Sequence, residues 1–425
     1  GRGTGVTEKE EHAARRFLAT LLALTFVMNM VARGVTETFA VFLLPVQQGL
    51  GLSRPEITLT YSVFMLAYGA FAPFAGQLID RFGARATYGF GLASLGCGYV
   101  LAGSATQLWH YLLTAGILSG LGSASLGMIA ASALLSRWFT NRIGTIVSIP
   151  YAAIGAGMLI LPPLTQFMLA STDWRTAHRL LGIGVLVLLP LILLAPLKRI
   201  TAGSPEWQEV RARAGTATAG PWTVSTAART GAFWGLFAAY LFTSVAAYSV
   251  LPHSVAYLIE KGFNPLVAAS AFGLTGMLSV IGILAIGWLS DRFGRLRSAT
   301  LSYFSTVVGI GALMLVSVWP SLVLVYAFVL FFGLMQGARG PIIIALVARL
   351  FPGGGVGTIY GTLSLAMGLG AGLGSWGSGL LYAWTGGYIV SFALAAAAAL
   401  TGLSIFWGAR SLREERVRVA PASVT

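Results

Sequence analysis

Apolar runs of bilayer-spanning length follow one another along almost the whole chain, and this pattern restricts the fold more than any other feature. A spanning helix needs roughly 20 mostly apolar residues, whereas barrel strands would show as alternating segments of about ten residues, a pattern not seen in this sequence. Of the 425 residues, 56% are hydrophobic and only 9% are charged. We therefore predict an all-α membrane protein with twelve transmembrane helices. The predicted spans are 17–45, 56–78, 86–104, 108–135, 143–169, 177–196, 230–258, 265–289, 298–318, 321–347, 357–382 and 386–408.

Basic residues are distributed unevenly between the predicted loops. The formal net charge is +14, but the Lys and Arg residues do not cluster as a nucleic-acid-binding face requires. If both termini are cytoplasmic, the inner segments hold 21 of the 27 Lys and Arg residues. The outer loops then hold only Arg54, Arg175, Arg179 and Lys261. This asymmetry predicts cytoplasmic termini. We expect a multi-pass protein of a bacterial inner membrane, with no nucleic-acid partner.

Two loop sequences recur at a nearly constant separation. The stretches GQLIDRFGAR and GWLSDRFGRL place Asp80 and Asp291 211 residues apart, and Arg137 and Arg349 are 212 residues apart. Two registers at nearly one offset indicate a duplicated six-helix unit. The predicted divisions are a cytoplasmic tail (1–16), an N-terminal six-helix bundle (17–196), a cytoplasmic linker (197–229), a C-terminal six-helix bundle (230–408) and a second cytoplasmic tail (409–425).

These loop motifs, the twelve predicted spans and the long central loop together resemble the major facilitator superfamily over about residues 15–410. The resemblance implies two pseudo-symmetric bundles, a substrate site between them near the middle of the bilayer, and transport by alternating access. The stretch RWFTNRIGTIVSIPYAAIGAGMLILPPL (137–164) resembles the loop and fifth helix of the monocarboxylate transporters and the oxalate/formate antiporters.

For the repeated loops, the resemblance implies a conformational latch that ties neighbouring helices together in one state and releases them in the other. The candidate latch residues are Asp80, Arg81, Arg85, Asp291, Arg292 and Arg295. The alternative is that these charges only solvate helix ends and set the topology. Neither role involves contact with a substrate.

Three charged residues, Arg33, Glu37 and Arg339, lie well inside predicted spans, away from the span ends. A charge at the centre of a membrane helix costs about 2.5 to 3.5 kcal/mol on insertion scales, so it is expected to face protein or a wet cavity. Arg33 and Glu37 are spaced i, i+4 and can pair on one helix face. The resemblance implies that the first and tenth spans line a central cavity, which would bring Arg33 and Arg339 into it from opposite halves.

Guanidinium groups bind carboxylates in bidentate fashion and keep their charge, so we predict an anion clamp with one arginine from each half. The alternative for Arg33 and Glu37 is an internal ion pair that only positions the first helix. Gln336 precedes Arg339 by one turn on the same predicted face. The seventh span carries a polar stripe, which binds substrate in one interpretation and joins helices in the other. The predicted substrate-binding residues are Arg33, Arg339, Gln336, Tyr240, Ser244 and Tyr248.

Glu37 is the predicted proton-coupling residue. Its protonation would remove a negative charge beside Arg33 and free that arginine for a substrate carboxylate, so proton and anion would favour each other's binding. We therefore expect proton-coupled symport of a small organic anion, a monocarboxylate-type acid. His253 is a weaker proton-carrier candidate.

The chain departs from the monocarboxylate branch at the positions that carry that branch's chemistry. The family places a lysine in the first helix and an Asp and Arg pair in the eighth, whereas Glu37, Ser279 and Ile283 occupy the nearest positions here. The oxalate/formate branch carries basic residues in the eighth and eleventh helices, and the apolar parts of 265–289 and 357–382 contain none. Neither family site is therefore transferred to this chain.

Other functions receive less support from the sequence. Without HExxH, paired Cys and His at metal spacing, or a phosphate-binding Gly-rich loop, no enzyme activity, cofactor or metal is expected. A receptor would share the scaffold, but the linker and tails contain no output module. Within transport, the alternative is a proton-coupled exporter of amphipathic drugs, or a carrier of a zwitterionic or cationic metabolite. The expected partners are a carboxylate, the proton and the lipid bilayer, and a monomer is expected.

Overall fold

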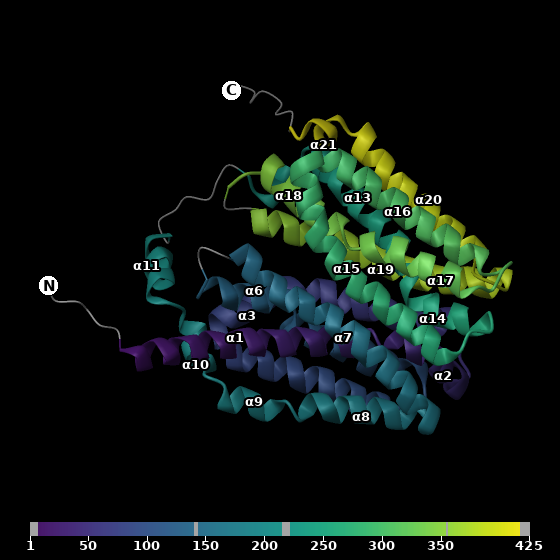
Figure 1. Ribbon diagram of the computed structural model, residues 1–425, viewed down its shortest axis with the longest axis horizontal. Helices are drawn as coiled ribbons and strands as arrows, with labels where there is room; N and C mark the ends of the chain where they lie inside the picture. Colours follow the sequence, from purple (N-terminus) through teal and green to yellow (C-terminus); the bar gives the residue numbers. More distant parts are fainter. Residues whose placement is uncertain (1–6, 140–142, 215–221, 354–355, 417–425) are drawn as a thin grey trace.

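The computed structural model describes residues 7–139, 143–214, 222–353 and 356–416 (Figure 1). In Figure 1 the N-terminal half, in purple and blue, lies below the C-terminal half, in green and yellow. Helices α10 and α11 of the linker lie at the left, where α1 also begins, and this side of the molecule is called the linker side. The opposite side, where α2 and α14 end, is called the far side.

Helices account for nearly all regular structure in the described ranges. The N-terminal half contains α1 (Glu8–Thr36), α2 (Phe39–Leu50), α3 (Arg54–Ala102), α4 (Leu108–Tyr111), the π-helix η1 (Leu112–Leu118), α5 (Ser119–Leu126), α6 (Met128–Ser136), α7 (Ile143–Ser171), α8 (Trp174–Leu186) and α9 (Leu189–Leu194). The linker contains α10 (Leu197–Ala202), α11 (Pro205–Ala214) and α12 (Val224–Ala227). The C-terminal half contains α13 (Gly231–Tyr248), α14 (Leu251–Glu260), α15 (Pro265–Phe293), α16 (Arg295–Leu315), α17 (Leu322–Phe328), the π-helix η2 (Val329–Gly333), α18 (Arg339–Leu350), α19 (Val356–Thr385), α20 (Ile389–Gly408) and α21 (Arg410–Glu414).

Twelve segments of the described chain are arranged to cross a membrane, as the apolar runs predict. Nine helices in the described ranges are long and apolar enough to cross. One of them, α3, has 49 residues and accounts for two crossings, because its backbone turns at Gly83 (φ 87°, ψ 168°), a conformation that glycine adopts readily. The interrupted segment 322–350 and helix α19 complete the set.

Helix α1 extends beyond its predicted span. It begins at Glu8 instead of residue 17, because Thr7 and Glu10 form a capping box that satisfies the first backbone N–H groups. The linker, which has no apolar run, folds into three short helices.

The first crossing of each three-helix repeat is interrupted near its middle. The breaks lie at 37–38 between α1 and α2, at Gly127 between α5 and α6, at 249–250 between α13 and α14, and at 336–338 before α18. The first and third breaks are 212 residues apart, close to the separation of the repeated loops. Interrupted helices are typical of transporters, where they line the substrate site.

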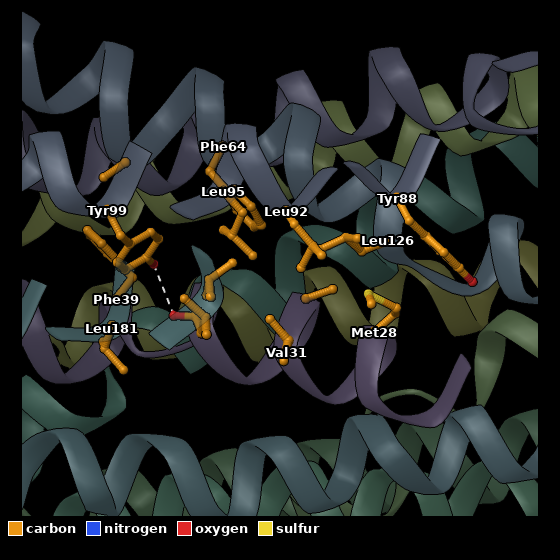
Figure 2. Packing of buried hydrophobic residues seen from close by; sticks show 14 of the residues in the cluster. Met28, Val31, Phe39, Phe64, Tyr88, Leu92, Leu95, Tyr99, Leu126 and Leu181 are labelled. Atoms are coloured by element: carbon orange, nitrogen blue, oxygen red, sulfur yellow. Dashed lines mark hydrogen bonds between the residues drawn. The ribbon is translucent and has the colours of Figure 1, made fainter. Parts of the chain in front are cut away.

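Each half has its own buried core. One cluster lies within residues 17–200 apart from two alanines, and a second lies within 227–412. Figure 2 shows the first, in which Met28 and Val31 of α1 face Leu92 and Leu95 of α3. The Tyr99 hydroxyl donates a hydrogen bond of 3.0 Å to the Val35 carbonyl and ties α3 to the end of α1.

The halves meet mainly along two pairs of helices, α3 against α19 and α7 against α15, and α2 also contacts α14. At the second contact, a Cβ atom added to Gly273 would lie 2.6 Å from the Met158 carbonyl oxygen, so only glycine permits this approach. On the first contact, the Ser62 hydroxyl donates to the Gly372 carbonyl over 2.7 Å. The interface between the halves therefore depends on close backbone packing.

Candidate functional site

A cavity of about 530 Å³ lies between the two halves. Its walls come from α1, α3, α5, α6 and α7 of one half and from α13, α14, α15, α18 and α19 of the other. Most lining residues lie in the parts of these helices that are nearer the linker side, as Tyr151 on α7 and Tyr360 on α19 illustrate. The cavity is therefore accessible from the linker side.

Arg33 and Glu37 lie in this cavity, and they form the ion pair that their i, i+4 spacing allows. The Met28, Val31 and Val35 side chains of α1 are buried in the core of the N-terminal half, so the opposite face of the helix is directed to the cavity. The Arg33 Nη2 atom is 3.2 Å from Glu37 Oε1, and the exposed fractions of the two side chains are 22% and 4%. The cavity therefore reaches the guanidinium more readily than the carboxylate.

Tyr61 of α3 supports the carboxylate from behind. Its hydroxyl donates to Glu37 Oε1 over 3.1 Å and to Oε2 over 3.3 Å, and its side chain is buried. The Tyr61 ring centroid is 6.0 Å from that of Tyr248, which belongs to α13 of the other half. Tyr248 in turn interacts with Arg33. Tyr61 was missed by the sequence analysis, because no pattern in its own span marks it.

Three other predicted binding residues line the cavity, namely Tyr240, Tyr248 and Gln336. The Tyr240 hydroxyl is 3.2 Å from that of Tyr360 on α19. Ser244 does not line the cavity: it is buried, and a Cβ on Gly370 of α19 would lie 2.8 Å from the Ser244 Cβ. Ser244 therefore packs against α19, which agrees with the alternative interpretation that the polar stripe joins helices.

The structure does not bring Arg339 into the cavity, and the predicted two-arginine clamp is absent. Arg339 Nη1 donates to the Thr306 hydroxyl over 2.7 Å and to the Met335 carbonyl over 2.5 Å. Its guanidinium carbon lies 4.8 Å from the Tyr303 ring centroid, and the residue is 1% exposed. The reason is the turn at 336–338, which interrupts the helix between Gln336 and Arg339. The two residues therefore do not share one helix face: Gln336 lines the cavity, while Arg339 points to α16.

The repeated loops adopt different ion pairs in the two halves. In the N-terminal half, Asp80 pairs with Arg137 over 2.5 Å, and the Arg137 guanidinium carbon is 4.8 Å from the Trp207 ring centroid in linker helix α11. Arg85 donates to the Ile192 carbonyl over 3.1 Å. Arg81 is exposed and its guanidinium carbon lies 5.5 Å from the ring centroid of the adjacent phenylalanine. Within the described residues, the pairing thus joins the loop after the second crossing to that after the fourth.

In the C-terminal half, the acidic partner comes from the segment after α21. Glu415 accepts from Arg295 over 2.9 Å and lies 3.1 Å from Arg349. The predicted counterpart of Asp80, Asp291, is exposed. The Arg292 guanidinium carbon is 5.3 Å from the Trp288 ring centroid. The two latch sequences therefore match while their side-chain partners do not.

A polar cluster that is partly buried closes the far side, and the sequence analysis assigned its arginine only to an outer loop. Arg54 of α3 donates to Tyr388 OH over 2.6 Å and pairs with Glu260 of α14 in the other half. The Arg54 guanidinium carbon lies 4.0 Å from the Tyr382 ring centroid, and Tyr382 OH donates to Glu260 over 3.0 Å. These four residues are called the Arg54 cluster. Arg54 and Glu260 are 206 residues apart, so no local sequence signal could pair them.

His253 belongs to the surroundings of this cluster and does not line the cavity. Its Nδ1 atom is 2.6 Å from Tyr388 OH, and its Nε2 atom is 2.8 Å from the Ser375 carbonyl oxygen. Both ring nitrogens are therefore engaged by neighbours. Within the described ranges, no group of three His, Cys, Asp or Glu side chains is placed to hold a metal ion.

Two six-helix halves around a central cavity that is open on one side and closed on the other define a membrane transporter. Residues 22–338 match the family described as Major Facilitator Superfamily. The chain belongs to this superfamily. Its relatives and its fold are those of transporters and not of enzymes.

Relatives from mammals and from a bacterium align over most of the chain. It is 26% identical over 384 residues to monocarboxylate transporter 13 of Rattus norvegicus, covering 89% of this chain and 86% of that protein. It is 28% identical over 402 residues to monocarboxylate transporter 11 of Mus musculus, covering 91% and 86%. It is also 24% identical to the uncharacterized MFS-type transporter YcxA of Bacillus subtilis, covering 88% and 90%.

Solved structures share the fold at low identity. A bacterial homolog of the human lysosomal transporter Spinster, in an inward-facing and occupied conformation, superimposes with a TM-score of 0.72 at 15% identity, covering 96% of this chain and 99% of that one. The Escherichia coli xylose transporter XylE, in a partially occluded inward-open conformation, gives a TM-score of 0.71 at 13% identity, covering 92% and 98%.

Proposed function

We propose that the chain is a secondary active transporter that moves a monocarboxylate-type organic anion together with a proton, by alternating access. The observation that carries this proposal is the pairing of Arg33 with Glu37 inside the cavity, 3.2 Å apart. The monocarboxylate transporters among the relatives support the choice of substrate class.

The pair supplies a simple coupling mechanism. While Glu37 is ionised, it occupies the guanidinium of Arg33, and an incoming carboxylate has to compete with it. When Glu37 takes up a proton, Arg33 becomes the unbalanced cation of the site and attracts the substrate anion. Tyr61 OH can donate to the carboxylate or accept from the protonated acid, so the buried group keeps a partner in both states. Proton and anion therefore bind together, and neither is favoured alone.

Transport in proteoliposomes tests this proposal. With a pH gradient imposed, the wild type is expected to accumulate a radiolabelled monocarboxylate, and Glu37→Gln is expected to exchange the acid without pH-driven accumulation. Arg33→Gln is expected to lose both activities. Glu56→Gln is the matched control, because Glu56 only caps α3 through Ser53 and Gln caps equally well. Full pH-driven accumulation by Glu37→Gln would refute the coupling role.

A zwitterion is the second candidate substrate, because the adjacent Arg33 and Glu37 offer one partner to a carboxylate and one to an ammonium group. In that case Glu37 stays ionised and binds the substrate directly. The same proteoliposomes separate the two: an amino acid that is transported without a pH gradient, and lost in both Arg33→Gln and Glu37→Gln, would favour the zwitterion.

A further inference from the structure

The cavity is much larger than its charged pair requires. About 530 Å³ falls within the roughly 300 to 1,000 Å³ of pockets that enclose drug-sized ligands. A three-carbon acid held on Arg33 would leave most of this space to water. The remaining walls therefore contain information about the rest of the substrate.

Tyrosine is the one aromatic residue type that lines the cavity within the described chain. The five lining tyrosines are Tyr68, Tyr151, Tyr240, Tyr248 and Tyr360. Three methionines, Met128, Met158 and Met367, also line the cavity. Tyrosine rings and methionine sulfur both make favourable contacts with an aromatic ring, and tyrosine hydroxyls keep such a cavity wet when it is empty.

The tyrosines connect the charged pair to the linker side. Tyr248 is beside Arg33, whereas Tyr240 lies eight residues earlier on α13, about 12 Å along a helix axis. Tyr240 OH is within 3.2 Å of Tyr360 OH. Tyr68 of α3 and Tyr151 of α7 also line the cavity. The site is thus elongated, with one charged end and one aromatic end.

The charged side chains of the cavity walls can neutralise one substrate carboxylate. Arg33 is the single Lys or Arg among the lining residues of the described chain, and Glu37 is the single acid. Arg339, the other intramembrane arginine, is held by Thr306 and Met335 away from the cavity. A second substrate carboxylate would therefore meet neutral side chains at a desolvation cost without compensation.

From these features we infer that the substrate is a monocarboxylate with an aromatic body, bound with its carboxylate at Arg33 and its ring among Tyr68, Tyr151, Tyr240 and Tyr360. This inference rests on the proposed function, since it assumes that a carboxylate binds Arg33.

Thermal unfolding of the purified full chain with matched probes tests the inference. The probes are propionate, 3-phenylpropionate, 2-phenylethylamine and succinate, and the measurement is the concentration that gives half of the maximal stabilisation. We expect 3-phenylpropionate to act at a concentration at least tenfold below that of propionate. We expect 2-phenylethylamine and succinate to give no comparable shift.

Two variants and a control locate the ring. Tyr151→Leu and Tyr240→Leu each keep apolar volume but remove a ring, and each is expected to raise the half-maximal concentration of 3-phenylpropionate by a larger factor than that of propionate, which reduces the preference. Tyr326→Leu is the control, because Tyr326 lies on α17, is 55% exposed and is outside the cavity. If one variant does not fold, the other still tests whether the ring of the substrate lies among the tyrosines.

The possible failures are distinguishable. Equal responses to propionate and 3-phenylpropionate, or a preference that both tyrosine variants retain, would overturn the inference and leave the proposed function intact. A response to succinate as strong as that to 3-phenylpropionate would also overturn it. A response to neither monocarboxylate, or to 2-phenylethylamine alone, would overturn the proposed function and the inference with it.

Discussion

Glu37 and its neighbours show how a membrane protein stabilises an acidic side chain within a membrane-spanning segment, where a charge carries a high desolvation cost. Removing one partner of a buried ion pair typically costs about 3 to 5 kcal/mol, because the other charge remains without compensation. Here the carboxylate has two partners, Arg33 at 3.2 Å and Tyr61 at 3.1 Å, from two different helices. In the proposed mechanism, the Tyr61 hydroxyl would stay bonded to Glu37 when Arg33 binds a substrate.

The Tyr61 hydroxyl gives a residue-scale prediction. Tyr61→Phe removes a hydrogen bond to a carboxylate, so we expect it to lower the free energy of unfolding by about 1.5 to 3 kcal/mol. The measurement is denaturant-induced unfolding in detergent micelles. Tyr88→Phe is the control, since the Tyr88 hydroxyl is equally buried but has no hydrogen-bond partner among the described residues. A cost for Tyr88→Phe equal to that for Tyr61→Phe would show that the Glu37 contact contributes nothing.

At the scale of helices, glycine positions decide how closely the two halves approach. Helix α15 contains both kinds of position: Gly273 faces the backbone of α7, while a Cβ on Gly287 would meet no atom within 4 Å. Since α7 and α15 belong to different halves, the proposed alternating access would require this contact to tolerate relative movement.

A matched pair of alanine substitutions tests the helix contact. Gly273→Ala places a Cβ 2.6 Å from the Met158 carbonyl oxygen, so we expect it to force α7 and α15 apart, to lower the thermal unfolding midpoint and to slow transport. Gly287→Ala is expected to be neutral, or to stabilise the helix by about 0.5 to 1 kcal/mol, because alanine loses less backbone entropy than glycine. Unchanged unfolding and transport in Gly273→Ala would mean that the helices do not pack this closely in the membrane.

Across the whole molecule, the cavity is open on the linker side and the Arg54 cluster closes the far side. Arg54 and Glu260 come from opposite halves, so their ion pair has to break before the far side can open. The pair is partly buried and shares its partners with Tyr382 and Tyr388. The cluster therefore stabilises the conformation described here relative to its far-side-open counterpart.

Removing the charge of Glu260 is expected to shift this balance. The reporter is Thr58→Cys in a Cys97→Ser background, because Thr58 is a buried residue of α3 that contacts α19. In this background, Glu260→Gln should increase labelling of the new cysteine by a membrane-impermeant thiol reagent from the far side several-fold. Glu56→Gln, which changes an acid at the same end of α3 but within one half, should leave labelling unchanged. Equal labelling of the two variants would exclude a gating role for the Arg54 cluster.

Local periodicity was sufficient to predict the crossings and the pairing of Arg33 with Glu37, whereas the expectation that they lie in a cavity came from the resemblance to the superfamily. Spans follow from runs of apolar residues, and the i, i+4 spacing of Arg33 and Glu37 places both on one face of α1 wherever that helix packs. The apolar face of the same helix is fixed by Met28, Val31 and Val35, which turn the pair toward the cavity. These features depend only on helix geometry and on the exclusion of apolar side chains from water.

Tertiary structure alone decided the partners of residues distant in the sequence. Arg339 does not take part in the predicted clamp, because a turn at 336–338 interrupts the helix and because Thr306 of α16 accepts a hydrogen bond from its guanidinium. Arg54 found Glu260 because the two halves meet on the far side. Along an unbroken helix, the direction of each side chain follows from its position in the sequence. Helix breaks and contacts between the halves depend instead on how the two bundles pack, and a local stretch of sequence does not determine that packing.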